Sequence, residues 1–319
     1  MSHVIRGRFA PTPSGRMHLG NLFSALMAWL SVRAQDGVML LRIEDLDRAR
    51  CRSEYTEQLI RDLLLFGLDF DEGGLSKPDR MGETCIQSER SAYYNEVIQT
   101  LSKKAHVYPC FCTRAQLHDV NAPHLSDHTP IYPGTCRHLS SEEIELRQTA
   151  RTPSLRIEVP DKTIVFDDLC QGHTEESLAS SCGDFVLRRA DGIVSYQLAV
   201  VSDDARMGVS EVVRGRDLLS SAARQIFLYE LLDETPPRFA HIPLLLAPDG
   251  RRLSKRDQSL SLESLLIRFS PEEIIGYLAA FSGLIQKPEP MKATELIPLF
   301  SFDRIKKDDI VLSPSFYHA

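Results

Sequence analysis

The spacing of apolar residues changes repeatedly along the first part of the chain. VIRGRFAP (4–11) has the pattern of a short strand, whereas NLFSALMAWLSVRAQ (21–35) carries apolar residues at helical spacing. MLLRI (39–43) predicts a buried strand, and RSEYTEQLIRDLLLFGL (52–68) predicts an amphipathic helix that a glycine closes. The order strand, helix, strand, helix indicates a parallel sheet with crossover helices, which is the α/β class.

The pattern changes between about residues 108 and 183. Prolines, histidines and cysteines replace the long periodic helices, and short strands are predicted at SLRIEV (154–159) and TIVFDD (163–168). We interpret this stretch as an inserted α+β subdomain. The doubly wound pattern resumes with DFVLRRADGIVSYQL from residue 184, and a series of modest helices follows from about residue 260.

These changes divide the chain into four expected segments. Residues 1–107 and 184–247 form the two halves of a Rossmann-type domain, and residues 108–183 are inserted between them. Residues 248–319 hold a basic loop followed by a helical subdomain. The predicted fold is therefore an α/β parallel sheet with an inserted α+β subdomain and C-terminal helices.

The composition is that of an ordinary globular protein. Of 319 residues, 43% are hydrophobic and 25% are charged, and no run approaches the roughly 20 apolar residues of a membrane span. The N-terminal MSHVIRGRF lacks the apolar core of a signal peptide, so a cytoplasmic protein is expected. A net charge of −7 argues against coating nucleic acid by charge alone, although it leaves room for a small RNA footprint.

FAPTPSGRMHLGN (9–21) places turn-forming residues and a histidine between the first strand and the first helix. Its prolines and first glycine force a tight connection, and Gly20 lets a ligand or another backbone segment approach closely. The N–H groups at the start of the following helix form a ready anion site, beside which His18 can donate to a phosphate. The alternative is a plain strand-to-helix turn with a surface histidine. No GK[ST] follows the glycines, so this is not a Walker loop.

GRRLSKRDQSLSL (250–262) is a second candidate motif. Arg251, Arg252, Lys255 and Arg256 cluster there beside a glycine and serines. A lysine suits a point-charge contact to a phosphate, and an arginine suits bidentate recognition. The alternative is a solvated charged face that binds nothing.

Three of the seven cysteines, Cys110, Cys112 and Cys136, cluster within the expected insertion. Three thiolates come close to completing a closed tetrahedral zinc site, which needs a fourth ligand. Chemistry alone favours a histidine, since imidazole binds zinc far more often than phenol does. The candidates by position are Tyr132, His124, His128 and His138. The alternative is three reduced cysteines without a metal.

Two motifs together resemble the signatures of a known enzyme class. HLGN (18–21) is similar to the HIGH signature, and RLSKR (252–256) to the KMSKS signature, of class I aminoacyl-tRNA synthetases, in the same order and with the same wide separation. RFAPTPSGRMHLGN, LRIEDLDRAR, SYQLAVVSDDARMGVSEVVRGRDLL and the SKRD loop resemble the glutamyl-tRNA synthetase group, over about residues 5 to 285. The resemblance implies a class I catalytic domain and an ATP-dependent ligase.

Such an enzyme activates glutamate by attack of its carboxylate on the α-phosphorus of ATP. The carboxylate is already ionised at pH 7, so the protein must align the reactants and neutralise charge on the phosphate oxygens. By resemblance, His18 and Lys255 are the catalytic residues. ATP is held by His18, Gly20, Asn21 and Lys255, and its phosphates carry Mg²⁺.

The glutamate pocket needs cations for two carboxylates and an anion for the ammonium group. By resemblance, its residues are Arg8, Phe9, Ala10, Pro11, Thr12, Glu44, Tyr196 and Arg214. Glu44 follows a buried strand and is suited to pair with the ammonium group, whereas the two arginines are not assigned to particular carboxylates. For each arginine the alternative is an ordinary surface ion pair. Asp203 and Asp204 are second-tier candidates, with the shaping of a loop as the alternative.

In the same group, a tyrosine four residues before the last cysteine supplies the fourth zinc ligand. That position is Tyr132 in YPGTC. The resemblance therefore implies one structural zinc, held by Cys110, Cys112, Tyr132 and Cys136, that orders the insertion. His138 is the alternative fourth ligand.

The short chain and its cysteine-containing insertion resemble the glutamyl-queuosine tRNA(Asp) synthetases. These enzymes attach glutamate to the modified base queuosine in the anticodon of tRNA(Asp), and they lack the anticodon-binding domain of full glutamyl-tRNA synthetases. The expected partners are L-glutamate, ATP and tRNA(Asp) carrying queuosine, for a monomer with no membrane contact. The alternatives are a small glutamyl-tRNA synthetase that charges the 3′ end of tRNA(Glu) and an inactive paralogue that binds RNA.

Overall fold

The computed structural model describes residues 4–113, 116, 131–253 and 260–317. At its centre lies a five-stranded sheet in the order β10-β9-β1-β2-β3, in which neighbouring strands are parallel. Its strands are β1 (Arg6–Phe9), β2 (Val38–Leu41), β3 (Glu72–Gly73), β9 (Glu211–Gly215) and β10 (Arg238–Ile242). The predicted parallel α/β sheet is confirmed.

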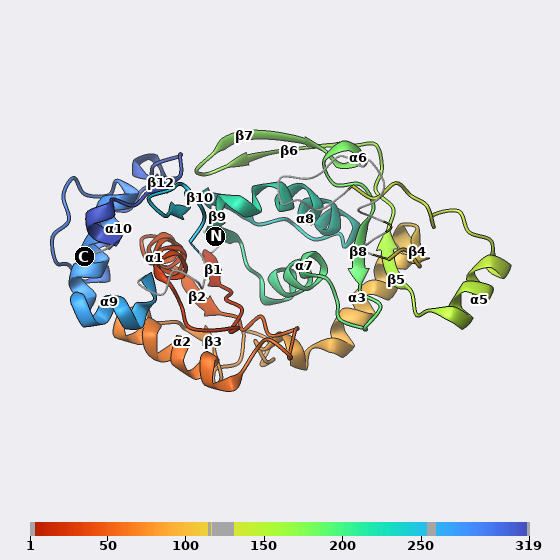
Figure 1. The fold of residues 1–319 in the computed structure, drawn as a ribbon, viewed down its shortest axis with the longest axis horizontal. Helices are drawn as coiled ribbons and strands as arrows, with labels where there is room; N and C mark the ends of the chain where they lie inside the picture. The colour runs from red at the N-terminus through yellow and green to blue at the C-terminus, as the bar shows by residue number, and fades with distance from the viewer. Residues whose placement is uncertain (1–3, 114–115, 117–130, 254–259, 318–319) are drawn as a thin grey trace.

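Helices cover both faces of this sheet (Figure 1). They are α1 (Leu19–Arg33), α2 (Ser53–Leu65), α3 (Ser91–Lys104), α7 (Tyr196–Met207) and α8 (Leu219–Leu231). On β2, Met39 and Leu41 belong to one apolar cluster together with α1, whereas Leu40 belongs to a second cluster together with α7 and α8. This alternation explains why the strand is apolar at every position, because a strand buried on both faces needs no polar side.

The segment expected as an insertion forms two small antiparallel sheets. The elements are β4 (Val107–Cys110), β5 (Ser154–Ile157) and β8 (Phe185–Arg188) in one sheet, the hairpin of β6 (Thr163–Asp168) and β7 (Gly172–Ser177), and the helices α5 (Ser141–Ala150) and α6 (Leu178–Ser181). In Figure 1 the first sheet lies at one end of the molecule, and the hairpin runs beside α8 and β10.

One strand differs from the sequence interpretation. We expected the doubly wound pattern to resume at Asp184, but β8 pairs antiparallel with β5 and so belongs to the sheet of the insertion. In β8, Phe185 and Leu187 are buried, and the residues between and after them are half-buried. That alternation is typical of a strand with one covered face rather than of a central parallel strand. The four domain ranges stay a prediction.

The C-terminal part shares an apolar cluster with α1 and α2. Its elements are β11 (Leu245–Leu246), α9 (Leu262–Arg268), α10 (Pro271–Ser282), β12 (Ile310–Val311) and α11 (Pro314–Tyr317). Short 3₁₀ helices lie at η1 (Gln87–Glu89), η2 (Arg216–Leu218), η4 (Ala293–Leu299) and η5 (Phe302–Arg304). The expected run of helices therefore holds for α9 and α10, whereas the chain after α10 holds only short elements: η4, η5, β12 and α11.

Local signals account for the ends of α10. The Ser270 side chain accepts from the backbone N–H of Glu273, and Pro271 occupies the first turn. The helix stops at Gly283, whose φ of 97° lies in the region that glycine tolerates best. None of the helices in the described part of the chain combines the length and the apolar character that crossing a bilayer requires.

Candidate active site

One cavity of about 440 Å³ lies at the carboxyl ends of β1 and β9. Every described residue that we predicted for glutamate or ATP binding lines it: Arg8, Phe9, Ala10, Pro11, Thr12, His18, Gly20, Asn21, Glu44, Tyr196 and Arg214. Open α/β sheets bind their ligands at this edge. The fold thus brings the predicted residues together, and their individual roles stay a prediction.

His18 caps the N-terminus of α1. Its Nδ1 accepts from the backbone N–H of Gly20 at 3.1 Å, and the Asn21 side chain accepts from the backbone N–H of His18 at 3.2 Å. A Cβ at position 20 would meet the imidazole at 3.1 Å, so glycine suits this cap. Because Nδ1 is an acceptor, the neutral ring carries its proton on Nε2, which is then a donor. α1 has no acidic residue in its first turn, which leaves the positive end of its dipole available to an anion.

Of the second predicted motif, residues 250–262, the structure describes residues 250–253 and 260–262. Lys255 itself lies outside the described residues. On its N-terminal side, Arg252 and Leu253 line the cavity. On its C-terminal side, Ser261 pairs with His18 in an isolated antiparallel bridge. Both ends of the segment that carries Lys255 therefore lie beside the cavity.

Buried ion pairs support two residues of the cavity wall, Arg8 and Glu44. Arg8 Nε lies 3.4 Å from the Asp204 carboxylate, and Arg42 donates to Glu44 Oε1 at 3.0 Å and to Asp204 Oδ1 at 2.5 Å. Burial raises the pKa of Glu44, although the charges of Arg42 and Arg8 work in the opposite direction. A fully buried arginine is therefore the group that offsets the cost of ionising Glu44.

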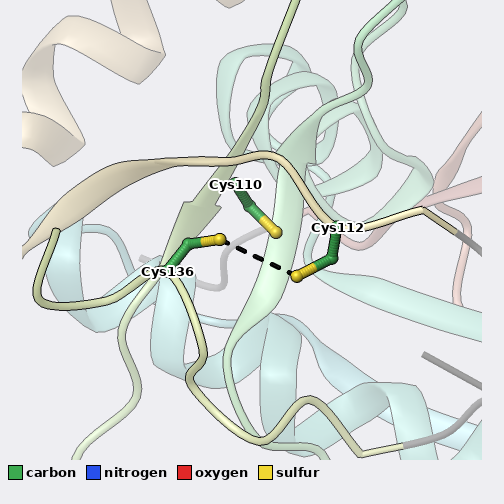
Figure 2. Close-up of side chains that lie close together, drawn as sticks. All are labelled: Cys110, Cys112 and Cys136. Atoms are coloured by element: carbon green, nitrogen blue, oxygen red, sulfur yellow. Dashed lines mark hydrogen bonds between the residues drawn. The ribbon is translucent and has the colours of Figure 1, made fainter. Parts of the chain in front are cut away.

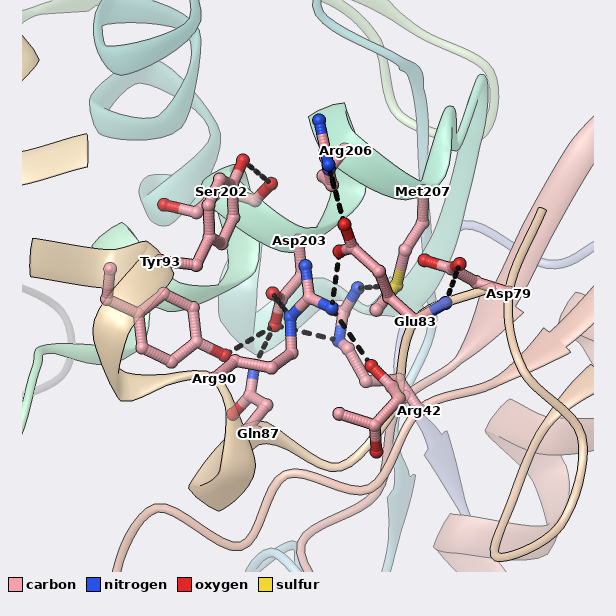
Figure 3. A network of polar contacts seen from close by, with 12 residues as sticks. Arg42, Asp79, Glu83, Gln87, Arg90, Tyr93, Ser202, Asp203, Arg206 and Met207 are labelled. Atoms are coloured by element: carbon pink, nitrogen blue, oxygen red, sulfur yellow. Dashed lines mark hydrogen bonds and ion pairs between the residues drawn. The ribbon is translucent and has the colours of Figure 1, made fainter. Parts of the chain in front are cut away.

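Asp203 connects three parts of the chain in a buried network (Figure 3). Its carboxylate accepts from Arg90 Nε at 2.8 Å, Gln87 Nε2 at 2.8 Å and the Tyr94 hydroxyl at 2.9 Å. Burial raises the pKa of Asp203, and Arg42 and Arg90 oppose that rise. The alternative that this aspartate shapes a loop is wrong, because it lies inside α7 with its side chain fully buried.

Arg214 is a buried cation whose hydrogen-bond partners are neutral. Its Nε donates to His241 Nε2 at 2.9 Å, its Nη1 to Gln225 Oε1 at 2.8 Å and its Nη2 to the carbonyl of Leu218 at 3.3 Å. No carboxylate in the described part of the chain lies within ion-pair distance of it, and burial lowers its pKa. A guanidinium stays charged in proteins, so this arrangement favours an anionic ligand.

Three thiols meet in the insertion, as Figure 2 shows. The sulfur atoms of Cys110, Cys112 and Cys136 all lie within 4.8 Å of one another, and those of Cys112 and Cys136 are 3.7 Å apart. The Tyr132 hydroxyl lies 3.4 Å from Cys110 Sγ and 3.8 Å from Cys112 Sγ. The three thiols fit three positions of a closed zinc site, and the phenolic oxygen of Tyr132 lies beside them.

The other candidates for a fourth ligand do not meet this cluster in the described residues. His138 is described and does not join the three sulfur atoms. His124 and His128 lie outside the described residues. The guanidinium of Arg156 lies 3.9 Å from the centre of the Tyr132 ring, which holds the phenol in place by a cation–π contact.

A second cavity, of about 760 Å³, adjoins the first. Both are lined by Thr12, Glu44 and Tyr196, and the second also reaches Cys110 and Cys112 of the thiol cluster. The wall of the second cavity carries four arginines: Arg50, Arg151, Arg156 and Arg189. A space therefore leads from the predicted glutamate pocket to the insertion, and its cations suit phosphates or the faces of bases.

Residues 4–286 match the family described as tRNA synthetases class I (E and Q), catalytic domain. The chain belongs to this family. The glutamyl-Q tRNA(Asp) synthetases of Symbiobacterium thermophilum and Nitratidesulfovibrio vulgaris are 49% and 45% identical to it, over 96% and 93% of this chain and 95% and 92% of theirs. The glutamate–tRNA ligase 2 of Alkalilimnicola ehrlichii is 42% identical over 86% of this chain and 58% of that enzyme.

The family likeness extends to solved structures. A glutamate tRNA ligase from Elizabethkingia meningosepticum, solved in complex with its amino acid, superposes with a TM-score of 0.83 at 25% identity, covering 99% of this chain and 68% of that one. The predicted class I synthetase fold and ATP-dependent ligase class are confirmed. The activity is of the glutamate–tRNA ligase type, with ATP and Mg²⁺ as the family implies.

Sequence reasoning missed several residues that support the cavity. Arg42 and His241 each interrupt an apolar run, MLLRI and FAHIPLLL, and a charged or polar residue in a buried strand is a usable signal. Asp168 and Gln225 have no such local signal, because their importance comes from contacts with distant parts of the chain.

Proposed function

We propose that this protein activates L-glutamate with ATP and transfers it to the queuosine base in the anticodon of tRNA(Asp), in the cytoplasm. One observation carries the proposal. The chain covers 95% and 92% of two glutamyl-Q tRNA(Asp) synthetases, whereas it covers 58% and 64% of two glutamate–tRNA ligases that are 42% and 37% identical to it. The likeness thus extends over nearly a whole enzyme of the first kind and over part of one of the second.

In the proposed glutamate complex, Glu44 pairs with the ammonium group. The charge of Arg8 acts on Glu44, so Arg8 lies on the side of the amino acid's α-carbon. Arg8 also contacts Asp204, whereas Arg214 has neutral partners. We therefore assign the α-carboxylate to the side of Arg8 and the side-chain carboxylate to Arg214. The lining from Phe9 to Thr12, with Tyr196, encloses the substrate.

The proposed ATP site is the start of α1. His18 Nε2 and the backbone N–H groups near Gly20 and Asn21 donate to the phosphates, and Lys255 adds positive charge from the second motif. A glutamate carboxylate oxygen bonds to the α-phosphorus as the bond to pyrophosphate breaks. The protein contributes alignment and charge neutralisation, and Mg²⁺ on the phosphates contributes further neutralisation.

Transfer follows when a nucleophile of the acceptor nucleoside attacks the carbonyl carbon of glutamyl-adenylate and AMP leaves. The second cavity supports this step, because it shares Glu44 and Tyr196 with the proposed glutamate pocket and carries four arginines on its wall. Its arginines can contact phosphates or stack on unpaired bases, which is how single-stranded RNA is commonly held.

We also propose one structural zinc, held by Cys110, Cys112, Tyr132 and Cys136. The convergence of three sulfur atoms and one phenolic oxygen supports it. The metal supplies order to the insertion and no step of the reaction. As domain limits we propose two catalytic halves, 1–107 and 184–247, the insertion 108–183 between them, and a last part, 248–319, that contacts the RNA stem. β8, at the start of the second half, nevertheless pairs with the sheet of the insertion.

A direct transfer assay tests the proposal. The chain is incubated with labelled glutamate, ATP and one of three RNAs: tRNA(Asp) with queuosine, tRNA(Asp) without it, or tRNA(Glu). We expect label on the first alone. Label on tRNA(Glu) alone would instead identify a small glutamyl-tRNA synthetase, which the 42% identity to a glutamate–tRNA ligase makes the second candidate.

An inactive RNA-binding paralogue is the remaining alternative. It is disfavoured because His18, Gly20, Glu44, Tyr196 and Arg214 are all present and line one cavity. Glutamate-dependent exchange of pyrophosphate into ATP separates an enzyme from a binding module. The exchange is measured without RNA and again with tRNA(Asp) that carries queuosine. If no exchange is seen in either case, the protein is an inactive RNA-binding module.

A further inference from the structure

A chain of two buried hydrogen bonds leads from Arg214 away from the cavity. Arg214 Nε donates to His241 Nε2 at 2.9 Å, and His241 Nδ1 lies 2.5 Å from Asp168 Oδ2. The three residues are 5%, 0% and 4% exposed. They come from β9, β10 and the end of β6, so the third member belongs to the hairpin of the insertion.

The surroundings of Asp168 fix the orientation of its carboxylate. Oδ1 accepts from the backbone N–H groups of Cys170 at 2.9 Å, Gln171 at 2.8 Å and His241 at 3.1 Å. Gln171 Nε2 also donates to the carbonyl of His241 at 2.7 Å. The hairpin turn is thus fastened to β10, the edge strand of the parallel sheet, and Oδ2 is left to face the imidazole.

This orientation determines the tautomer of His241. An ionised carboxylate only accepts hydrogen bonds, so Nδ1 must carry the ring proton that faces Asp168. Nε2 then presents a lone pair to the Nε–H of Arg214. Burial, together with the positive charge of Arg214, lowers the pKa of His241 to about 4 despite the opposing effect of Asp168, so the ring is neutral near pH 7.

His241 is a neutral acceptor, so it holds Arg214 in place without cancelling the positive charge of the guanidinium. Of the five N–H donors of a guanidinium, one each goes to His241, Gln225 and Leu218, and the hydroxyl of Tyr196, which lines the cavity, is a further neutral partner. A carboxylate in place of His241 would have held the guanidinium equally well but would have cancelled its charge. A neutral acceptor fixes the group and leaves the charge for a ligand.

We propose that Asp168 and His241 are positioning residues that orient Arg214 with its charge uncancelled, so that the pocket selects the carboxylate of glutamate over the amide of glutamine. This inference rests on the proposed function, because it concerns the same amino-acid pocket. The charge of Asp204 acts on Arg214 from a distance, but no carboxylate in the described residues contacts the guanidinium. A neutral ligand therefore leaves this buried cation without a contacting counter-charge, whereas a carboxylate supplies one, and sites with unpaired buried polar groups discriminate strongly. The preference for glutamate over glutamine then depends on Asp168, which the hairpin of the insertion supplies.

Asp168→Asn tests the tautomer. The backbone N–H groups around Oδ1 require an acceptor there, so the new NH₂ group must face His241 Nδ1. The ring proton then moves to Nε2, where it opposes the Nε–H of Arg214. We expect the KM for glutamate to rise about tenfold or more, the KM for ATP to stay within about twofold, and the preference for glutamate over glutamine to fall.

Two substitutions at position 241 provide a matched pair. His241→Gln keeps a neutral oxygen acceptor for Arg214, whereas His241→Leu removes it. We expect His241→Gln to retain a glutamate KM within about threefold of the unmodified protein and His241→Leu to lose affinity as Asp168→Asn does. An unchanged glutamate KM in His241→Leu would overturn the proposal. Equal losses for glutamate and ATP in both variants would indicate a merely structural role and would also overturn it.

Two measurements do not require catalytic activity, so they test this inference independently of the proposed function. NMR of ¹⁵N-histidine-labelled protein should show His241 protonated on Nδ1 in the unmodified chain and on Nε2 in Asp168→Asn. Calorimetry should show that Asp168→Asn weakens glutamate binding more than glutamine binding. If the unmodified chain catalyses no glutamate-dependent exchange, the proposed activity fails, and these two measurements still decide the positioning role. The same tautomer in both proteins would contradict it.

Discussion

Arg8 and Asp204 lie 3.4 Å apart with side chains that are 4% and 2% exposed, although 196 residues separate them in the sequence. Their contact connects β1 to α7, the two elements that carry the cavity residues Arg8 and Tyr196. Removing one member of a buried pair leaves the other charge without compensation. We therefore expect Asp204→Asn to lower the free energy of unfolding by about 3–5 kcal/mol, measured by urea denaturation.

A surface ion pair provides the control for this prediction. Arg189 and Asp191 pair with side chains that are 44% and 47% exposed. Solvent screens such a pair, so Asp191→Asn should change the free energy of unfolding by less than about 1 kcal/mol. Equal losses in the two variants would show that the buried pair has no special role in stability.

The zinc site can be tested by metal analysis. We expect the purified chain to hold about one zinc, because three thiolates and one further ligand form a closed site. Cys136→Ser should lose the metal and destabilise the insertion. Tyr132→Phe should weaken zinc binding, whereas His138→Ala should leave it unchanged. Loss of zinc in His138→Ala alone would assign the fourth ligand to the histidine.

Stability should fall as the pH falls from about 6.5 to about 4. Over that range the unfolded chain binds a proton on His241, while the folded chain, in which burial lowers the pKa of His241 from 6.5 to about 4, does not. The lowered pKa of His241 contributes at most about 3 kcal/mol to the free energy of unfolding. This contribution is complete above pH 6.5 and is lost as the pH falls toward 4. The charged groups that act on the imidazole are Asp168, Arg214 and Arg8.

Urea denaturation between pH 7.5 and pH 4.5 measures this effect. The variant His241→Gln carries no titrating group at that position, so its free energy of unfolding should change less over the same range. Parallel curves for the two proteins would mean that His241 does not titrate in this window.

Lys255→Ala should slow glutamate activation by about tenfold or more, with a smaller effect on glutamate affinity, because the proposed role of Lys255 is to stabilise charge on the ATP phosphates. Pyrophosphate exchange at saturating glutamate measures the rate. Lys162→Ala is the matched control, since Lys162 pairs with Glu230 on the surface. A rate within about twofold, under 0.5 kcal/mol of barrier, would exclude the role.

The fold was predictable where local patterns determine it. The first strand, helix, strand and helix were predicted from apolar spacing, whereas the residues that line the cavity were named by resemblance to the motifs of a known enzyme group. β8 was misplaced, because a short alternating strand can join either of two sheets and the sequence does not say which.

Other parts of the site depend on contacts that no local pattern encodes. Asp168 and His241 are 73 residues apart, and although a histidine in an apolar run is a local signal, nothing in the sequence shows that Asp168 is its partner. Asp203 was a second-tier site candidate with the shaping of a loop as the alternative, since paired aspartates favour turns, but its buried partners Arg90 and Tyr94 lie more than a hundred residues away in the sequence. Tertiary contacts override the local preference in both cases.

The way the hairpin is fastened to β10 limits how this enzyme can be recombined with its relatives. A chimaera that exchanges residues 108–183 would also exchange Asp168, and its junction would separate β8 from β5. The donor segment would therefore have to bring a carboxylate at the equivalent of Asp168, and the cut would have to fall after Arg188. The inserted part is one continuous stretch of sequence, but in space its Asp168 belongs to the hydrogen-bond chain that ends at the cavity residue Arg214.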